Sequence, residues 1–321
     1  AEMLHRNGTI MTENLRSARC TDTYILKGTD VEEIWEPRFT YHGFQYVEVT
    51  GFPREPDLET ITGIVMHSAM PPVGTFKCSD KMVNKLYDNI VWSQLSNFFE
   101  IPTDCPQRDE RLGWTGDAQL FIRSATYNMD VATFFTKWLG SLEDDQRPSG
   151  AFPDFAPMPY LLFEPSPGWM DAGVICPYTL YQVYGDTRVI KRHYKAMTKF
   201  MDFLQRTSHA YLREPQYHSW GDWLSLENKI PESLIATAYY AYDAKLMAEM
   251  AAAIEKKEDA QKYNRLFENI KTAFNRAFVM ENGRILGDTQ TGYALALNMG
   301  FLTNQFNELA GQHLVDLIQK R

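Results

Sequence analysis

The feature that most constrains the fold is a helical period of apolar residues that begins near Ser79. From Val83 to Phe98 the apolar side chains recur at three- and four-residue intervals, as in an amphipathic helix, and Ser79 is the expected N-cap. The same period predicts helices over 117–128, 131–143, 171–184, 187–206, 232–255, 258–278, 288–299 and 304–320. About nine helices with short polar connections predict an all-α domain in which helices pack on helices.

Residues 1 to about 75 have a different pattern. β-branched and aromatic residues gather in short runs at 23–26, 45–50 and 61–66, and Gly28 and Gly51 separate these runs. We therefore expect short β-strands here. Because three or four strands are too few for a self-sufficient sheet, we expect their partner strands to lie upstream.

The composition excludes several classes of protein. With 41 Asp and Glu against 32 Lys and Arg, the net charge of -9 is unsuited to a nucleic-acid backbone. No apolar run approaches the ~20 residues that span a bilayer, so we expect no membrane partner. The four cysteines are far apart without a CxxC pair, and no glycine-rich phosphate loop is present. We therefore expect no metal and no cofactor.

One segment, residues 102–117, is too charged and too rich in Pro and Gly for regular structure. A charge-dense loop between helices is typical of a functional site. Glu110 has acidic neighbours and lies close to Trp114 in sequence, and a protonated Glu beside ionised Asp residues is the pattern of a general acid in glycoside hydrolysis. Arg108 and Arg111 oppose protonation, so a salt-bridge cluster that closes a long loop is the alternative.

Three downstream loops, 144–154, 167–171 and 219–224, each place Trp or Phe beside Asp. Aromatic faces stack on sugar rings while carboxylates accept hydrogen bonds from sugar hydroxyls. Each loop by itself is better explained by a core aromatic residue and a helix-capping Asp. Together with the acidic loop, however, the three favour a carbohydrate pocket.

The run from Asp104 to Asp117, DCPQRDERLGWTGD, resembles the signature of the bacterial α-L-rhamnosidases, glycoside hydrolase family seventy-eight. Segments at 39–49, 168–172, 221–224 and 288–297 resemble family segments in the same order. The resemblance implies a mainly α fold, an (α/α)6 toroid over 77–321, preceded by part of a β-sandwich domain over 1–76. It also implies inverting hydrolysis of terminal α-L-rhamnosyl residues from a rhamnose-containing glycan or glycoside.

The resemblance also implies roles for individual residues. Glu110 matches the general acid that protonates the departing glycosidic oxygen. Asp104 and Asp117 match residues that hold the rhamnose hydroxyls, and Trp114 matches a pocket wall. The full substrate-binding set that we expect is Asp104, Arg108, Asp109, Trp114, Asp117, Trp169, Asp171 and Trp223.

One part of the family pattern is missing. An inverting hydrolase needs a second carboxylate as general base, and the family places it in a Trp-Glu-Arg-Trp-like motif that does not occur between Glu110 and Arg321. The nearest similar run, at residues 35–38, lies in the β region. We therefore expect a toroid that is incomplete at its C-terminal end, with the base beyond residue 321 and the chain inactive alone.

Two alternatives to a rhamnosidase stay open. The first is another exo-acting (α/α)6 glycosidase that takes a different sugar, and the second is a non-catalytic carbohydrate-binding protein. The compartment is also open between the cytoplasm and the periplasm of a bacterium, and the sequence does not indicate an oligomeric state.

Overall fold

The structure is a computed structural model that describes the chain except for residues 30, 160–164, 216–218, 227–229 and 321. The chain divides into two compact units. The first comprises Ala1–Ala69 and Thr75–Gly113, and the second comprises Met70–Gly74 and Trp114–Arg321. The domain boundary after residue 76 stays a prediction.

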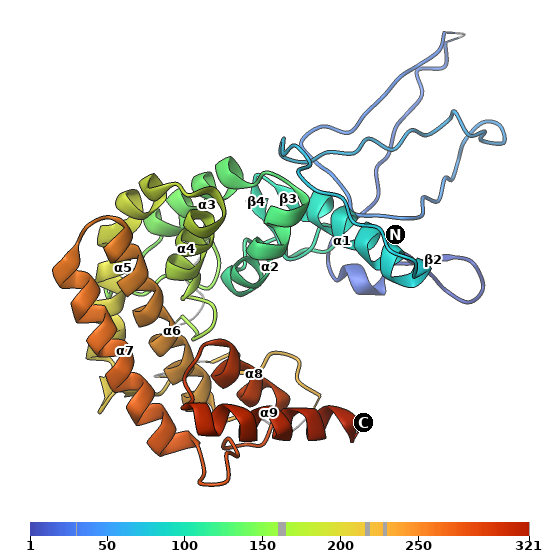
Figure 1. The fold of residues 1–321 in the computed structure, drawn as a ribbon. Helices are drawn as coiled ribbons and strands as arrows, with labels where there is room; N and C mark the ends of the chain where they lie inside the picture. Colours follow the sequence, from blue (N-terminus) through green and yellow to red (C-terminus); the bar gives the residue numbers. More distant parts are fainter. Residues whose placement is uncertain (30, 160–164, 216–218, 227–229, 321) are drawn as a thin grey trace. The chain divides into compact units, whose positions relative to one another are not determined.

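The first unit contains little regular structure (Figure 1). Strands β1 (Met3–Leu4) and β2 (Ile10–Met11) pair antiparallel, with Met3 opposite Met11. Its other elements are the 3-10 helix Glu13–Leu15, the helix α1 (Lys81–Asn97) and the antiparallel strands β3 (Phe98–Phe99) and β4 (Ile101–Pro102).

The strands expected at 23–26, 45–50 and 61–66 do not form. A strand is stable only when a partner satisfies its backbone N–H and C=O groups. In the described part of the first unit the runs 23–26 and 61–66 have no such partner, and in 45–50 only Gln45 and Tyr46 form backbone bonds, with Ala1. Ile25 at 84% and Ile64 at 71% exposure face solvent. The sequence pattern therefore indicated strand-forming residues correctly but predicted the strands themselves wrongly.

The N-cap of helix α1 lies one residue later than expected. Asp80, rather than Ser79, is the N-cap residue, and its carboxylate accepts hydrogen bonds from the backbone N–H groups of Met82 at 2.7 Å and Val83 at 3.3 Å. These bonds satisfy two of the donors that a helix start leaves unpaired.

The second unit is built from helices whose ends lie within two residues of those predicted. They are α2 (Thr115–Asn128), α3 (Ala132–Asp144), α4 (Ala172–Tyr184), α5 (Thr187–Arg206), α6 (Glu232–Ala253), α7 (Lys257–Phe278), α8 (Gln290–Asn298) and α9 (Asn304–Gln319). The short strands β5 (Ser208–His209) and β6 (Leu212–Arg213) pair antiparallel. The predicted mainly α fold is confirmed.

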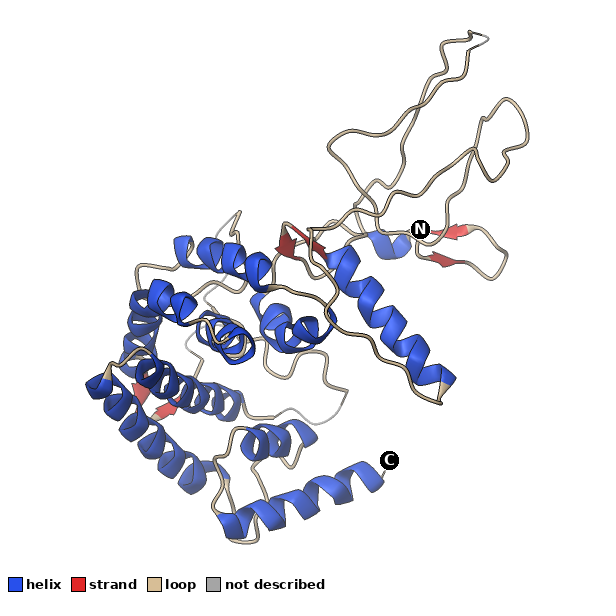
Figure 2. Ribbon diagram, turned by 45° about the horizontal axis from the view of Figure 1, so that its top comes forward, coloured by secondary structure: helices blue, strands red, loops and turns tan. Residues whose placement is uncertain are grey.

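These helices form two layers (Figures 1 and 2). The even-numbered helices contact one another in sequence, α2 with α4, α4 with α6 and α6 with α8. The odd-numbered helices pack beside them, α3 and α5 on α4, α7 on α6 and α9 on α8. Accordingly α6 is buried on nearly all sides, whereas α5 and α7 bury one apolar face each. The unit is thus a row of helical hairpins.

Large aromatic residues fill the core of the second unit. Trp138, Phe135, Phe200 and Phe274 are fully buried, and each contributes roughly 1.5–3 kcal/mol of transfer free energy. The indole N–H of Trp138 donates to the carbonyl oxygen of Ala156 at 2.9 Å. In the described part of the chain, no helix has both the length and the apolar character required to cross a bilayer.

Candidate active site

The part of the acidic loop from Asp104 to Leu112 is a closed turn within the first unit. The N–H of Asp104 donates to the carbonyl oxygen of Leu112 at 3.1 Å, and the N–H of Leu112 donates to Oδ1 of Asp104 at 3.0 Å. The Arg111 guanidinium lies 4.5 Å from the centre of the Tyr41 ring and donates to the Tyr41 carbonyl oxygen at 3.1 Å. The φ of Arg111 is 51°, in the left-handed region that non-glycine residues rarely adopt. The bonds between Asp104 and Leu112 therefore close the turn, and the contact of Arg111 with Tyr41 fixes it from outside.

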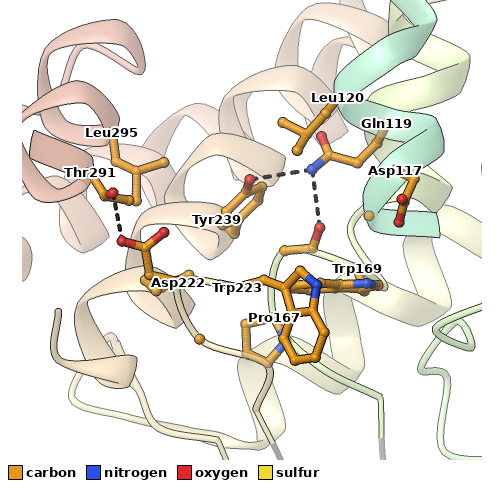
Figure 3. A pocket seen from close by; sticks show the side chains of 14 residues that line it. Asp117, Gln119, Leu120, Pro167, Trp169, Asp222, Trp223, Tyr239, Thr291 and Leu295 are labelled. Atoms are coloured by element: carbon orange, nitrogen blue, oxygen red, sulfur yellow. Dashed lines mark hydrogen bonds between the residues drawn. The ribbon is translucent and has the colours of Figure 1, made fainter. Parts of the chain in front are cut away.

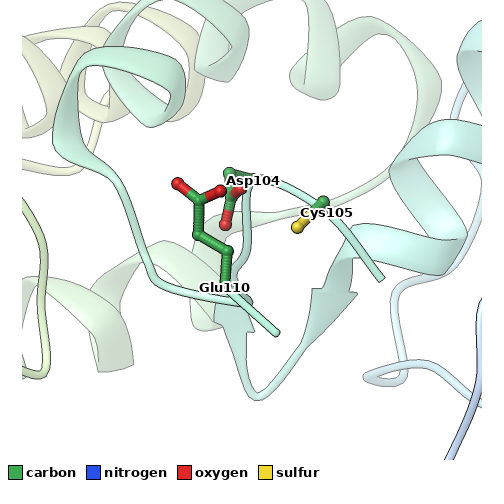
Figure 4. A group of neighbouring side chains, drawn as sticks. All are labelled: Asp104, Cys105 and Glu110. Atoms are coloured by element: carbon green, nitrogen blue, oxygen red, sulfur yellow. The ribbon is translucent and has the colours of Figure 1, made fainter. Parts of the chain in front are cut away.

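Arg108 joins the two carboxylates at the centre of this loop. Its Nε donates to Oε2 of Glu110 at 2.9 Å, and its Nη2 donates to Oδ2 of Asp104 at 3.1 Å. A second guanidinium, that of Arg16, donates to the same oxygen of Glu110 at 3.0 Å. Figure 4 shows the carboxyl groups of Asp104 and Glu110 next to each other. The salt-bridge cluster considered from the sequence is present, and it contains the expected acid.

Burial separates the environments of the carboxylates in this loop. The Asp104 side chain is 7% exposed, and its burial, with a smaller contribution from Glu110, raises its pKa. Asp109 turns away from the cluster and accepts hydrogen bonds from the N–H and hydroxyl of Ser17, and these lower its pKa. The structure thus brings together Asp104, Arg108 and Glu110, while the substrate contact expected of Asp109 stays a prediction.

Asp104, Cys105 and Glu110 each place a potential metal ligand within 4.8 Å of the others. Burial raises the pKa of the Cys105 thiol to about 11, so it is protonated at neutral pH. Arg108 already binds both carboxylates. This chemistry fits an ion-paired network better than a cation site.

The second unit contains a pocket of about 380 Å³, within the range of small-molecule sites. Its wall comes from the N-terminal parts of α2, α6 and α8 and from the loops that precede α4 and α6. The lining residues are Gly116, Asp117, Gln119, Leu120, Pro167, Gly168, Trp169, Gly221, Asp222, Trp223, Ile235, Tyr239, Thr291 and Leu295 (Figure 3). The N-terminal parts of α2, α6 and α8 therefore meet at this pocket, where the helix dipoles favour negatively charged side chains.

Tryptophan side chains form one side of the pocket. Trp169 and Trp223 line it, and both pack on Trp220, with ring centres 6.1 Å and 5.1 Å away. Trp114 packs on Trp220 from another direction at 5.5 Å and is not among the lining residues. Gly116 allows this arrangement, because a Cβ there would lie 2.6 Å from Nε1 of Trp169.

The pocket lining also contains polar groups and three aliphatic residues, Leu120, Ile235 and Leu295. Gln119 Nε2 donates to the carbonyl oxygen of Gly168 at 3.0 Å and to the Tyr239 hydroxyl at 3.3 Å. Burial raises the pKa of Tyr239 to about 12, which keeps its hydroxyl neutral. On the other side, the Thr291 hydroxyl donates to Oδ2 of Asp222 at 2.7 Å (Figure 3).

Of the expected carboxylates in this unit, Asp117 lies in the pocket wall and Asp171 lies behind it. Asp117 is exposed in the first turn of α2. Asp171 is 1% exposed, and its Oδ2 accepts from the N–H of Gly168 at 2.6 Å. Asp171 also helps, after burial, to raise the pKa of the buried Asp243 well above its ordinary value. In this structure Asp171 supports the loop that carries Trp169, and its predicted substrate contact is untested.

Sequence reasoning did not select three residues that the structure places in or behind the pocket: Asp154, Trp220 and Asp222. All three occur in the loops that were predicted to bind a sugar. Trp220 and Trp223 lie in the same loop, and no sequence pattern distinguishes their roles. In the structure, Trp220 is the residue that contacts the other three indoles. Only long-range contacts distinguish them.

Helical hairpins that end in an acidic, tryptophan-lined pocket are suited to a carbohydrate ligand. Comparison with known proteins agrees. Residues 71–321 match the bacterial alpha-L-rhamnosidase 6 hairpin glycosidase domain, and residues 1–67 match the bacterial alpha-L-rhamnosidase concanavalin-like domain. The chain belongs to the bacterial α-L-rhamnosidase family, and the resemblance noted in the sequence is confirmed.

Individual relatives are similar over the whole chain. The crystal structure of the Streptomyces avermitilis α-L-rhamnosidase complexed with L-rhamnose is 46% identical, with a TM-score of 0.96 over 100% of this chain and 31% of that one. The native α-L-rhamnosidase of Aspergillus terreus is 35% identical, with a TM-score of 0.94 over 99% of this chain and 38% of that one. A curated α-L-rhamnosidase of Formosa agariphila is 38% identical over 100% of this chain and 35% of its own length. The chain thus spans about a third of the length of these relatives.

Proposed function

We propose that the protein hydrolyses terminal α-L-rhamnosyl residues from rhamnose-containing glycans or glycosides, with inversion at the anomeric carbon. The observation that carries this proposal is the match over the entire chain to the Streptomyces avermitilis enzyme, which was crystallised with L-rhamnose. The pocket supports it, because it combines aromatic faces with carboxylates as sugar recognition requires.

In the proposed complex the pocket holds the terminal sugar. Trp169 and Trp223 offer indole faces to the ring, and the carboxylates of Asp117 and Asp222 accept hydrogen bonds from its hydroxyls. The neutral Tyr239 hydroxyl provides a further polar contact. Since each hydrogen bond to a charged group contributes about 1.5–3 kcal/mol, two such carboxylates are sufficient to fix the orientation of a monosaccharide.

Glu110 is the proposed general acid, on the basis of its place in the family motif. It donates its proton to the glycosidic oxygen as the bond to the anomeric carbon breaks, so the aglycone leaves as a neutral alcohol. Arg108 fixes the Glu110 carboxyl at 2.9 Å and keeps Asp104 beside it at 3.1 Å. We propose that Asp104 and Arg108 hold the acid in position, and that Asp104 also contacts the substrate.

The second half of the reaction needs a nucleophile on the opposite face of the sugar. In an inverting hydrolase this is a water activated by a second carboxylate roughly 6.5–9.5 Å from the acid. We propose no general base among residues 1–321. Azide, a small anionic nucleophile that needs no base, can replace that water and yields the inverted glycosyl azide.

The test is turnover of a panel of nitrophenyl glycosides, with and without azide. We expect selective release of nitrophenol from the α-L-rhamnoside in the presence of azide, with a glycosyl azide of inverted configuration as the product, and little release without azide. Preference for another sugar would indicate a different exo-acting glycosidase. Binding of L-rhamnose without turnover under either condition would indicate a carbohydrate-binding protein.

A further inference from the structure

The buried carboxylate of Asp154 lies in the loop between α3 and α4 and is outside the pocket lining. Asp154 is 7% exposed. Its backbone carbonyl accepts hydrogen bonds from the N–H and the hydroxyl of Thr115, both at 2.8 Å, at the first residue of α2. The position of Asp154 is therefore tied to the helix that carries Gly116 and Asp117.

The side chain of Asp154 reaches the two other loops that form the pocket. Its Oδ1 accepts from the N–H of Ser166 at 2.7 Å, and its Oδ2 accepts from the indole Nε1–H of Trp220 at 2.9 Å. The Ser166 hydroxyl oxygen in turn accepts from the backbone N–H of Trp220 at 3.0 Å. Trp220 is thus held through both its backbone and its ring, and both sets of bonds lead to Asp154.

Trp220 is the centre of the tryptophan cluster formed by Trp114, Trp169, Trp220 and Trp223. It contacts each of the other three, whereas the ring contacts of Trp169 and Trp223 within the cluster are with Trp220. Since Trp169 and Trp223 line the pocket, the angle of the Trp220 ring determines the surface that they present.

We propose that Asp154 is the positioning residue of the sugar-stacking surface: it orients Trp220, and through Trp220 it orients Trp169 and Trp223. Asp154 does not contact the sugar. The part of this inference that concerns rhamnose affinity rests on the proposed function, whereas the part that concerns the indoles does not.

The charge of Asp154 provides a signal of its own. Burial raises its pKa to about 7, the bonds from Ser166 and Trp220 and the charge of Arg147 oppose this rise, and the charge of Asp171 adds to it. Because the carboxylate lies in contact with the Trp220 indole N–H, a change in its ionisation changes the electric field on that ring. Tryptophan emission depends on this field and reports the event directly.

The first experiment follows tryptophan emission while the pH is changed through neutrality. We expect a step with its midpoint near the pKa of about 7 in the wild-type protein. The step should be absent in Asp154→Asn, which cannot ionise, and in Trp220→Phe, which keeps a ring but lacks the N–H donor. Trp92→Phe, at an exposed position of α1, is the matched control and should keep the step.

The second experiment measures the dissociation constant for L-rhamnose in a double-mutant cycle. Asp154→Asn and Trp220→Phe are each expected to weaken binding about tenfold, which corresponds to ~1.4 kcal/mol. If Asp154 acts through Trp220, the double variant is weakened no further than either single variant. Two independent structural defects would instead add and give about a hundredfold loss.

The outcomes separate the two levels of the inference. A step that persists unchanged in Asp154→Asn, or effects on rhamnose binding that add, would overturn the assignment of Asp154. Circular dichroism checks that the variants fold. If Asp154→Asn does not fold, the emission test is decided by Trp220→Phe. If the wild-type protein bound no rhamnose, the proposed function would fail while the emission step still decided the Asp154–Trp220 link.

Discussion

Arg108 donates from Nε to Oε2 of Glu110 at 2.9 Å, while Arg16 donates to the same oxygen at 3.0 Å. The two arginines differ in environment: the Arg108 side chain is 30% exposed and also binds Asp104, whereas that of Arg16 is 58% exposed. A guanidinium that is itself fixed by a second carboxylate and partly buried holds a carboxyl group more firmly than an exposed one does. Arg108 is therefore the residue that sets the position of the proposed acid.

Replacing these arginines should separate their contributions. Arg108→Gln removes the link between Glu110 and Asp104. With azide present, we expect rhamnoside turnover to fall by about 10–100-fold, because loss of a bond to a charged group costs ~1.5–3 kcal/mol. Arg16→Gln is the matched control and should change turnover by less than about fivefold, because exposed ion pairs contribute ~0–1 kcal/mol. Equal effects of the two variants would contradict this order.

The Asp222–Thr291 contact predicts a further pair of effects on sugar binding. Asp222→Asn removes the charge that accepts from a sugar hydroxyl, so affinity for L-rhamnose should fall about tenfold or more. Thr291→Val only removes the hydroxyl that donates to Oδ2 of Asp222 at 2.7 Å, so affinity for L-rhamnose should fall about fivefold or less. Calorimetric titration measures both. A larger loss in Thr291→Val than in Asp222→Asn would show that Asp222 is not the binding group.

Gly116→Ala should damage the pocket without removing any functional side chain. The new Cβ would lie 2.6–2.9 Å from three atoms of the Trp169 indole, so the ring must move. We expect a loss of stability of ~1–3 kcal/mol together with weaker rhamnose binding. Gly311→Ala in α9 is the control, because nothing lies within 4 Å of its Cβ, and it should be neutral or stabilising by up to ~1 kcal/mol. Unchanged rhamnose affinity in Gly116→Ala would remove Trp169 from the stacking surface.

The raised pKa of Asp154, about 7 against an ordinary 3.8, predicts how stability depends on pH. Between these values the folded state binds more protons than the unfolded state, so the free energy of unfolding falls as the pH rises through this window and is level above it. In Asp154→Asn this contribution is absent. The free energy of unfolding at a pH of about 4 minus that at about 7 should therefore be smaller than in the wild-type protein by ~1–3 kcal/mol. Urea unfolding at the two pH values measures it. The buried Asp243 is present in both proteins and cancels; an unchanged difference would contradict the assignment.

The helices of the second unit could be predicted because each carries its own periodic signal. In α5, for example, one apolar face against a charged one gave the bounds 187–206 directly. The first unit shows the opposite case. The run 45–50 has strand-forming residues but no strand, because pairing depends on a partner that the run itself does not encode.

The candidate site could be predicted in part for the same reason. Glu110, Asp104 and Arg108 lie within one short loop, so their association was evident from the sequence, and the structure joins them by ion pairs. The bond between Asp154 and Trp220 spans 66 residues. No local pattern distinguishes this Asp from a helix-capping one, and only the packing of three loops brings it to the indole.

The most direct test of the account is the dependence of Glu110→Gln on the leaving group. A general acid matters most when the departing oxygen is basic, and its removal typically costs ~10²–10⁴-fold. With azide present, we expect a loss of at least about a hundredfold for a phenyl α-L-rhamnoside but a much smaller loss for a dinitrophenyl one, with L-rhamnose affinity preserved. Equal losses for the two substrates, or unchanged turnover of the phenyl rhamnoside, would contradict the assignment of Glu110 as the acid.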